Sequence, residues 1–138
     1  MKPLPQTENS LVLRTDFSES AAWSDICAEI QQPVGEFMAY VECVSDPEYE
    51  GLQPEQLVSA SALGPYRGYV FVVDRTTLTH PEHPILVVDL HNEPGRTFRV
   101  IPAEMWAIEN NLSLANMDFD EFADAVDEDG VFRGFPES

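Results

Sequence analysis

The sequence predicts an α/β fold (or α+β) with one mixed sheet of about five strands covered by helices. Strand-like and helix-like segments alternate in the first half of the chain, and consecutive strands follow in the second half. The runs 69–73 (YVFVV) and 85–90 (ILVVDL) lack the polar alternation of a half-exposed strand, so both faces of the sheet should be covered. The length and the lack of a linker-like stretch favour one domain, residues 1–138.

Five segments have the composition of strands, because apolar and β-branched residues are concentrated in each. The second of them alternates apolar and more polar residues, which predicts a strand near an edge of the sheet. The pair Pro94-Gly95 has the order of a type II turn, so the last strand should run back antiparallel. The predicted strands are 10–15, 36–45, 69–73, 85–90 and 97–101.

The helices are predicted from apolar periodicity and from residues that favour helix ends. Asp16 or Ser18 is expected to cap a first helix that ends before Pro33. Two further helices should begin with a proline in the first turn. Asp118, with a glutamate three residues on, predicts a capping box for the last helix. These helices should bury the apolar residues Trp23, Ile26, Cys27 and Ile30, then Leu57 and Val58, then Met105, Trp106 and Ile108, and finally Phe119, Phe122, Ala123 and Val126.

The chain is strongly acidic, with 7 Lys and Arg against 25 Asp and Glu, so the net charge is 7 − 25 = −18. Nucleic acid and anionic membranes are polyanions, and this charge excludes them as favoured partners. A basic protein is a favoured partner, although an acidic surface also serves solubility alone. The segment 102–138 holds ten acids and one arginine, which makes it either a solvated face or a docking surface for a basic protein.

Nothing in the sequence predicts a signal peptide or a membrane span, so we expect a cytoplasmic protein. Cys27 and Cys43 fall within periodic segments and are interpreted as small buried hydrophobic residues rather than as a disulfide framework.

A candidate ligand-binding site is predicted at the ends of three strands, where charged residues follow apolar runs. If these strands are parallel, their carboxyl ends meet at one edge of the sheet, where open α/β folds bind ligands. Three aspartates there could hold Mg²⁺ or act as acid and base, with an arginine as an anion clamp. Alternatively the aspartates are helix caps and turn formers. The residues concerned are Arg14, Asp16, Asp74, Asp89 and His91.

Motifs of the common enzyme classes are absent, so the sequence leaves open whether the protein is an enzyme. It contains no G-x-S-x-G, H-E-x-x-H, C-x-x-C, Walker A or G-x-G-x-x-G pattern. His80, Glu82 and His83 lie within four residues, but the prolines among them fit no zinc motif, and an ordinary loop is expected. We therefore predict no metal site and no cofactor.

Three stretches of the chain, LPQTENSLVLRTDFSESAAW, HPILVVDLHNEPGRTFRVIPAEMW and ENNLSLANMDFDEFADAVDEDGVFRGF, resemble a family of small acidic bacterial proteins. That family is a domain of unknown function. The resemblance implies a bacterial, cytoplasmic, stand-alone domain, and it implies no catalytic residues.

Two functions are compatible with these observations. The first is a non-catalytic acidic interaction protein that binds a basic protein partner. The second is a small enzyme, or a ligand- or metal-binding domain, that uses the carboxylates at the strand ends. The charge and the missing motifs favour the first.

Overall fold

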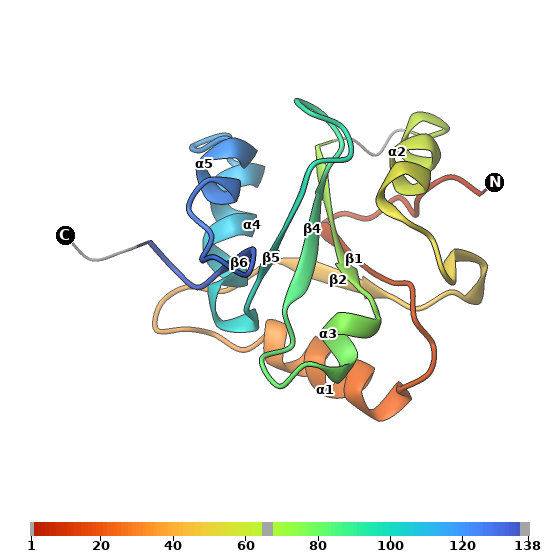
Figure 1. The fold of residues 1–138 in the computed structure, drawn as a ribbon, viewed down its shortest axis with the longest axis horizontal. Coiled ribbons are helices and arrows are strands. Elements are labelled where there is room, and N and C mark those ends of the chain that lie inside the picture. Colours follow the sequence, from red (N-terminus) through yellow and green to blue (C-terminus); the bar gives the residue numbers. More distant parts are fainter. Residues whose placement is uncertain (1, 65–67, 136–138) are drawn as a thin grey trace.

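The computed structural model describes residues 2–64 and 68–135, which form a six-stranded mixed sheet with helices on both faces (Figure 1). The predicted α/β class is confirmed, with one strand more than expected. In space the strands follow the order β2-β1-β3-β4-β5-β6. They are β1 (Ser10–Arg14), β2 (Val41–Val44), β3 (Tyr69–Val73), β4 (Ile85–Asp89), β5 (Thr97–Val100) and β6 (Val131–Phe132).

The sheet changes direction at its centre. Strands β2, β1 and β3 are parallel, whereas β4 runs antiparallel to both β3 and β5. The antiparallel return after Pro94-Gly95 is thereby confirmed. Because β3 and β4 point in opposite directions, residues that follow these two strands lie at opposite ends of the sheet.

Five α-helices and two 3₁₀ turns connect the strands in the described part of the chain. The capping box of the last helix is confirmed, since Asp118 and Glu121 exchange their side-chain and backbone hydrogen bonds. The expected cap of the first helix is wrong, because the N-cap position is held by Glu19, one residue after Ser18 and three after Asp16. The elements are α1 (Ser20–Ile30), η1 (Pro47–Tyr49), α2 (Pro54–Ala62), α3 (Arg75–Thr79), η2 (Pro102–Glu104), α4 (Met105–Ser113) and α5 (Phe119–Ala123).

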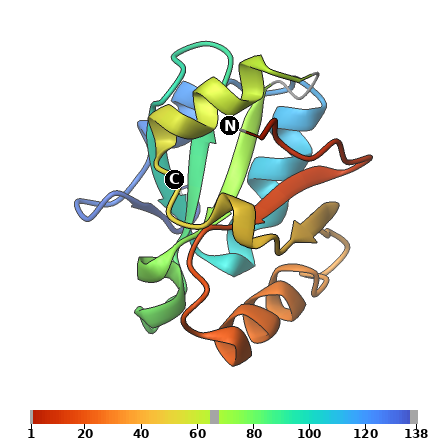
Figure 2. The ribbon, with the colours of Figure 1, turned by 90° about the vertical axis from the view of Figure 1, so that its right-hand side faces the viewer.

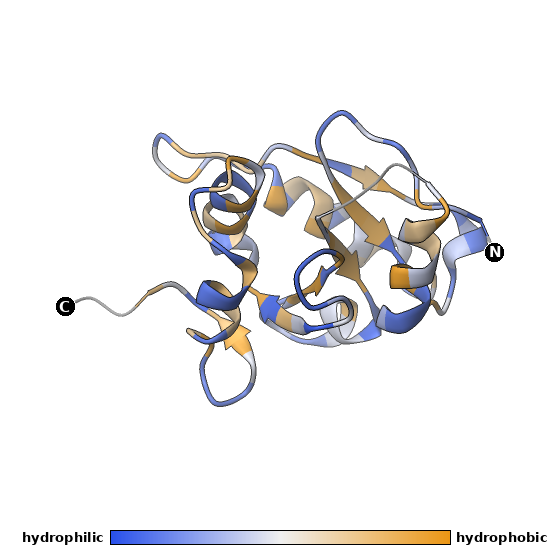
Figure 3. Ribbon diagram, turned by 90° about the horizontal axis from the view of Figure 1, so that it is seen from above, coloured by the Kyte–Doolittle hydropathy of each residue, from blue (hydrophilic) through white to orange (hydrophobic). Residues whose placement is uncertain are grey.

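Both faces of the sheet are covered, as the apolar runs predict. One face packs against α1, α3, α4 and α5, and the other against α2, η1 and the N-terminal segment (Figure 2). Strand β3 contributes to both, with Phe71 and Val73 in the first core and Val70 and Val72 in the second. Seen from above, apolar residues line the strands and polar ones the surface loops (Figure 3).

The predicted second strand is only half correct, because residues 36–40 are irregular and only Val41–Val44 form β2. Pro33 and Gly35, which has a positive φ of 62°, turn the chain before this segment. The Phe37 ring then stacks on Trp106 of α4, with the ring centres 4.3 Å apart, instead of entering a strand register. The edge position of β2 is confirmed.

Strand β6 is absent from the sequence prediction, since two residues are too short to show a period. It is positioned by aromatic packing: Phe122 of α5 contacts the rings of Phe98, Phe132 and Phe135. Phe132 and Phe135 also contact each other, so the end of the described chain packs back on the domain.

Candidate functional site

The predicted site residues lie at two opposite ends of the sheet. Arg14, Asp16 and Asp74 follow the parallel strands β1 and β3. Asp89 pairs with Tyr69 at the start of β3, and His91 follows it. A five-residue strand spans about 13 Å, so the two groups cannot reach one substrate. The expected convergence of the three aspartates is wrong, because β4 is antiparallel to its neighbours.

Arg14 is a buried cation, 5% exposed, at the carboxyl end of β1. Its guanidinium lies over the rings of Phe17 and Trp23. In the described part of the chain, no carboxylate lies within ion-pair distance of it. Its nitrogens donate to three neutral oxygens, the Asp16 carbonyl and the hydroxyls of Ser45 and Ser20. Arg14 therefore ties β1 to α1 and to the end of β2, and its positive charge is not cancelled by a direct partner.

The two aspartates at this end act as caps and turn formers. The Asp16 carboxylate accepts the N–H and O–H of Ser18, and these hydrogen bonds lower its pKa. Asp74 caps α3 through the Thr77 N–H and forms an ion pair with Arg99 at 2.7 Å. Burial raises the pKa of Asp74, but the hydrogen bonds and charge of Arg99, together with Thr77, outweigh burial and leave the pKa below 3.8.

Replacing Asp74 with asparagine is expected to lower the free energy of unfolding by about 1 kcal/mol, because Arg99 loses its charged partner while the cap survives. The folded-state pKa is depressed, so this stabilisation is present above pH 3.8 and disappears as the pH falls through the folded pKa. Urea unfolding of both proteins across pH checks this. Asp25→Asn, at an exposed α1 position, is the control and should cost nothing measurable. If the stability difference between the wild-type protein and Asp74→Asn grew as the pH fell, the assignment of a depressed pKa to Asp74 would be contradicted.

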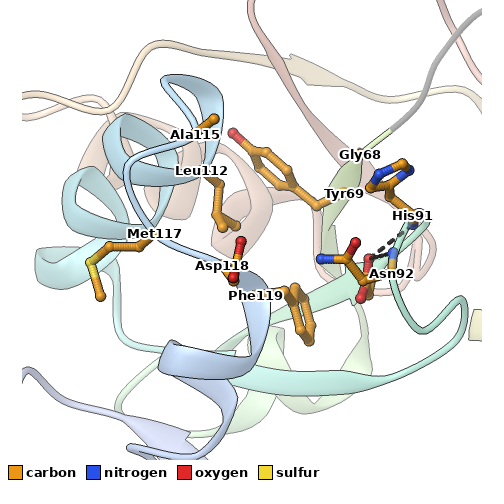
Figure 4. Close-up of a pocket in the computed structure, with 10 residues that line it drawn as sticks. Gly68, Tyr69, His91, Asn92, Leu112, Ala115, Met117, Asp118 and Phe119 are labelled. Atoms are coloured by element: carbon orange, nitrogen blue, oxygen red, sulfur yellow. Dashed lines mark hydrogen bonds between the residues drawn. The ribbon is translucent and has the colours of Figure 1, made fainter.

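Asp89 and His91 border a cavity of about 270 Å³, called here the His91 cavity (Figure 4). The Asp89 carboxylate is buried and accepts the backbone N–H groups of His91, Asn92 and Glu93, so it shapes the turn. Figure 4 shows His91 and Asn92 on one side and apolar side chains on the other. The cavity is lined by Gly68, Tyr69, Asp89, His91, Asn92, Leu112, Ala115, Met117, Asp118 and Phe119.

The histidine-rich loop is held by local hydrogen bonds. The His80 Nδ1 accepts the Glu82 N–H, the His83 ring bonds the Thr77 carbonyl, and Glu82 pairs with Arg133. Among residues 2–64 and 68–135, no group of three His, Cys, Asp or Glu side chains is placed to bind a metal ion.

A second hollow, of about 300 Å³, lies between α4 and the chain that leads into β1 and β2. We call it the α4 groove. Two of the six large apolar side chains that are exposed in the described chain line it, Tyr40 (56%) and Leu114 (69%). Two more, Phe37 (48%) and Val34 (40%), belong to the same loop as Tyr40: Phe37 stacks on Trp106 of α4, and Val34 pairs with Phe37 in a β-bridge. The groove is lined by Glu8, Asn9, Ser10, Tyr40, Glu109, Asn110, Ser113 and Leu114.

The floor of the α4 groove is a buried carboxylate, that of Glu109, which is 4% exposed. It accepts the backbone N–H of Tyr40 at 2.8 Å and the Ser10 hydroxyl at 3.1 Å. Asn110 extends the network by donating to the Met38 carbonyl and to Glu109. These bonds attach the 31–40 loop to α4, so Glu109 both positions the loop and gives the groove a negative floor.

The positive charges of the described surface are largely used within the molecule. Arg96 pairs with Asp120 and Asp124, and Arg133 pairs with Asp127 and Asp129, so the acidic C-terminal face is partly neutralised. Among residues 2–64 and 68–135, no lysine or arginine lines the α4 groove, where Glu8 stands at the rim and Glu109 at the floor. Excess negative charge and exposed apolar surface therefore coincide at this groove.

The sequence prediction missed the residues of the groove. Phe37 and Tyr40 fall in the part of the predicted second strand that is irregular, and Leu114 follows the end of α4. The signal that could have identified the loop was Pro33 with Gly35, which interrupts strand formation.

The fold defines the protein as an α/β domain built on a six-stranded mixed sheet. Residues 9–135 match the model of a family described as a domain of unknown function, DUF6924, and the chain belongs to that family. A search of curated proteins finds no match. No helix in the described residues is long and apolar enough to cross a membrane.

Proposed function

We propose that this protein is a non-catalytic interaction protein that binds a basic protein partner at the α4 groove. The observation that carries the proposal is the coincidence, in one groove, of exposed Tyr40 and Leu114 with the carboxylates of Glu8 and Glu109, and with no cation from the part of the chain that the structure describes. Interfaces commonly have an apolar centre and a polar rim. The partner that fits is a segment whose Lys or Arg side chain enters the groove and whose apolar neighbours cover the aromatic residues.

The rest of the molecule supports this choice of partner. A net charge of −18 attracts a basic protein from a distance and raises its association rate. The same charge opposes nucleic acid and anionic membrane. Two free cysteines fit the reducing environment of the cytoplasm, where we place the protein.

A labelled peptide of about twelve residues, built from lysine and leucine, tests the proposal by fluorescence anisotropy. The expected result is binding at low salt that weakens at least tenfold as salt rises from about 0.05 M to 0.5 M, because the attraction is screened. A glutamate–leucine peptide should not bind, and a lysine–serine peptide should bind at least tenfold more weakly. Equal affinity for all three peptides would overturn the proposal.

A second candidate function is small-ligand binding in the His91 cavity. The observation that favours it is a cavity of about 270 Å³ with an exposed imidazole and carboxamide at its edge. A metabolite that raises the melting temperature of the protein, but not of His91→Ala, would support it. The carboxylates of Asp16 and Asp74 play no part in this candidate, since they lie at the other end of the sheet.

A further inference from the structure

Two cysteines that are 16 positions apart meet in the fold: Cys27 on α1 and Cys43 on the edge strand β2. Their thiols are hydrogen bonded to each other. Both side chains are half-buried and pack against the core, so each has a fixed position and partial access to solvent. Two sulfurs held in contact by separate elements need little movement to reach the short S–S distance of a disulfide.

The surroundings distinguish the two sulfurs. The Cys43 Sγ receives a hydrogen bond from the Cys27 thiol and a second from the Gln31 amide nitrogen, at 3.8 Å. Donors stabilise a thiolate, so these bonds lower the pKa of Cys43. The bond to Cys43, followed by burial, raises the pKa of Cys27. The two thiols therefore titrate together. When the pair has lost its first proton, the negative charge lies on Cys43.

Arg14 adds a positive charge to this environment. Its guanidinium acts on the Cys27 thiol and lowers the pKa of that thiol, against the larger effects of Cys43 and of burial. No carboxylate in the described chain lies within ion-pair distance of Arg14, so its charge is available to act on the Cys27 sulfur. The pair thus has an amide donor at Cys43, a cation that acts on Cys27 and a thiol–thiol interaction, which are features of a reactive dithiol rather than of two inert core cysteines.

We infer that Cys27 and Cys43 form a redox-active dithiol, with Cys43 as the attacking sulfur and Cys27 as the resolving sulfur, that closes to a disulfide with a low-molecular-weight disulfide as oxidant. The Cys43 thiolate attacks one sulfur of the oxidant, forms a mixed disulfide and expels one thiolate, which takes up a proton. Cys27 then loses its proton and attacks the Cys43 sulfur, expelling the second thiolate. Two electrons pass from the protein sulfurs to the oxidant, which leaves as two thiols.

The disulfide would join α1 to β2 across the connection that carries the 31–40 loop. It closes a short loop of chain, which restricts the unfolded state and stabilises the folded one. The inference does not depend on the α4 groove, because it rests on the two thiols and on the groups around them.

The test is to incubate the folded, reduced protein with oxidised glutathione and to measure intact mass, thiol alkylation and melting temperature. The expected product is a monomer that has lost two hydrogens, resists alkylation and melts roughly 5–10 °C higher, and dithiothreitol reverses all three. Cys27→Ser should stop at one glutathione adduct on Cys43, and Cys43→Ser should react at least tenfold more slowly.

Peptide mapping of the wild-type protein keeps the test decisive if a variant fails to fold. A Cys27–Cys43 peptide pair from the native, oxidised protein supports the inference. Two free thiols after prolonged incubation, a glutathione adduct on each cysteine, or a disulfide-linked dimer would overturn it.

Discussion

Replacing Phe37 and Leu114 together with alanine is expected to weaken binding of the lysine–leucine peptide about 100-fold. Leu114 lines the α4 groove and is 69% exposed, and Phe37, which is 48% exposed, stacks on Trp106 of α4, so both are available to bury apolar surface against a partner. Truncation of a central aromatic or large apolar contact typically costs more than 1 kcal/mol, and about 2.7 kcal/mol in total corresponds to 100-fold. Anisotropy titrations of the two proteins measure the change.

Leu63→Ala is the matched control for this double variant. Leu63 is 59% exposed and follows α2 on the opposite face of the sheet, so it offers similar apolar surface away from the groove. Its replacement should leave the affinity unchanged. A similar loss of affinity in both proteins would show that the peptide binds exposed apolar residues without regard to place.

Glu109→Ala is expected to lower the free energy of unfolding by about 2–4 kcal/mol, because three part-buried donors lose a carboxylate acceptor. The donors are the Tyr40 N–H, the Ser10 hydroxyl and the Asn110 amide, which water entering the groove can satisfy only in part. The substitution also frees the 31–40 loop from α4. Urea unfolding followed by tryptophan fluorescence measures the loss of stability. Faster amide hydrogen exchange at Tyr40 would report the release of the loop.

Glu109→Gln separates the charge from the hydrogen bonds. The glutamine keeps one acceptor oxygen in the same place, so it should cost less than half of what alanine costs. Alanine and glutamine variants of equal stability, with the Tyr40 amide still protected, would show that Glu109 does not anchor the loop.

The fold could be predicted well wherever local pattern determines structure. The apolar runs of β3 and β4, the turn at Pro94-Gly95 and the capping box at Asp118 each specify their own conformation, and the structure confirms them. The start of the first helix is an exception, since Asp16 satisfies Ser18 instead of the helix. Two acceptable capping residues close together in sequence leave that choice to tertiary contacts.

The site was harder to predict because it depends on strand direction and on long-range contacts. Apolar content does not reveal that β4 runs antiparallel to β3, and this direction separates Asp89 from Asp16 and Asp74. The meeting of Cys27 with Cys43 likewise follows from the parallel pairing of β1 with β2 after α1. Neither arrangement has a signature in a single sequence.

The stacking of Phe37 on Trp106 is another long-range contact that has no signature in a single sequence. Alternation in residues 36–45 fits a strand, and contacts with α4 override it in the first half. Tyr40 and Leu114 could be recognised as parts of one groove only once α4 and the 31–40 loop were placed side by side.

The central claim, that the α4 groove is the docking surface, is tested most directly by following the lysine–leucine peptide titration through backbone amide NMR shifts. Our account predicts that the largest changes fall in residues 34–40 and 106–114, with Leu63 and the α2 amides unaffected. Changes centred on the acidic turn at 127–130, on the His91 cavity, or spread evenly over the exposed acids would contradict it.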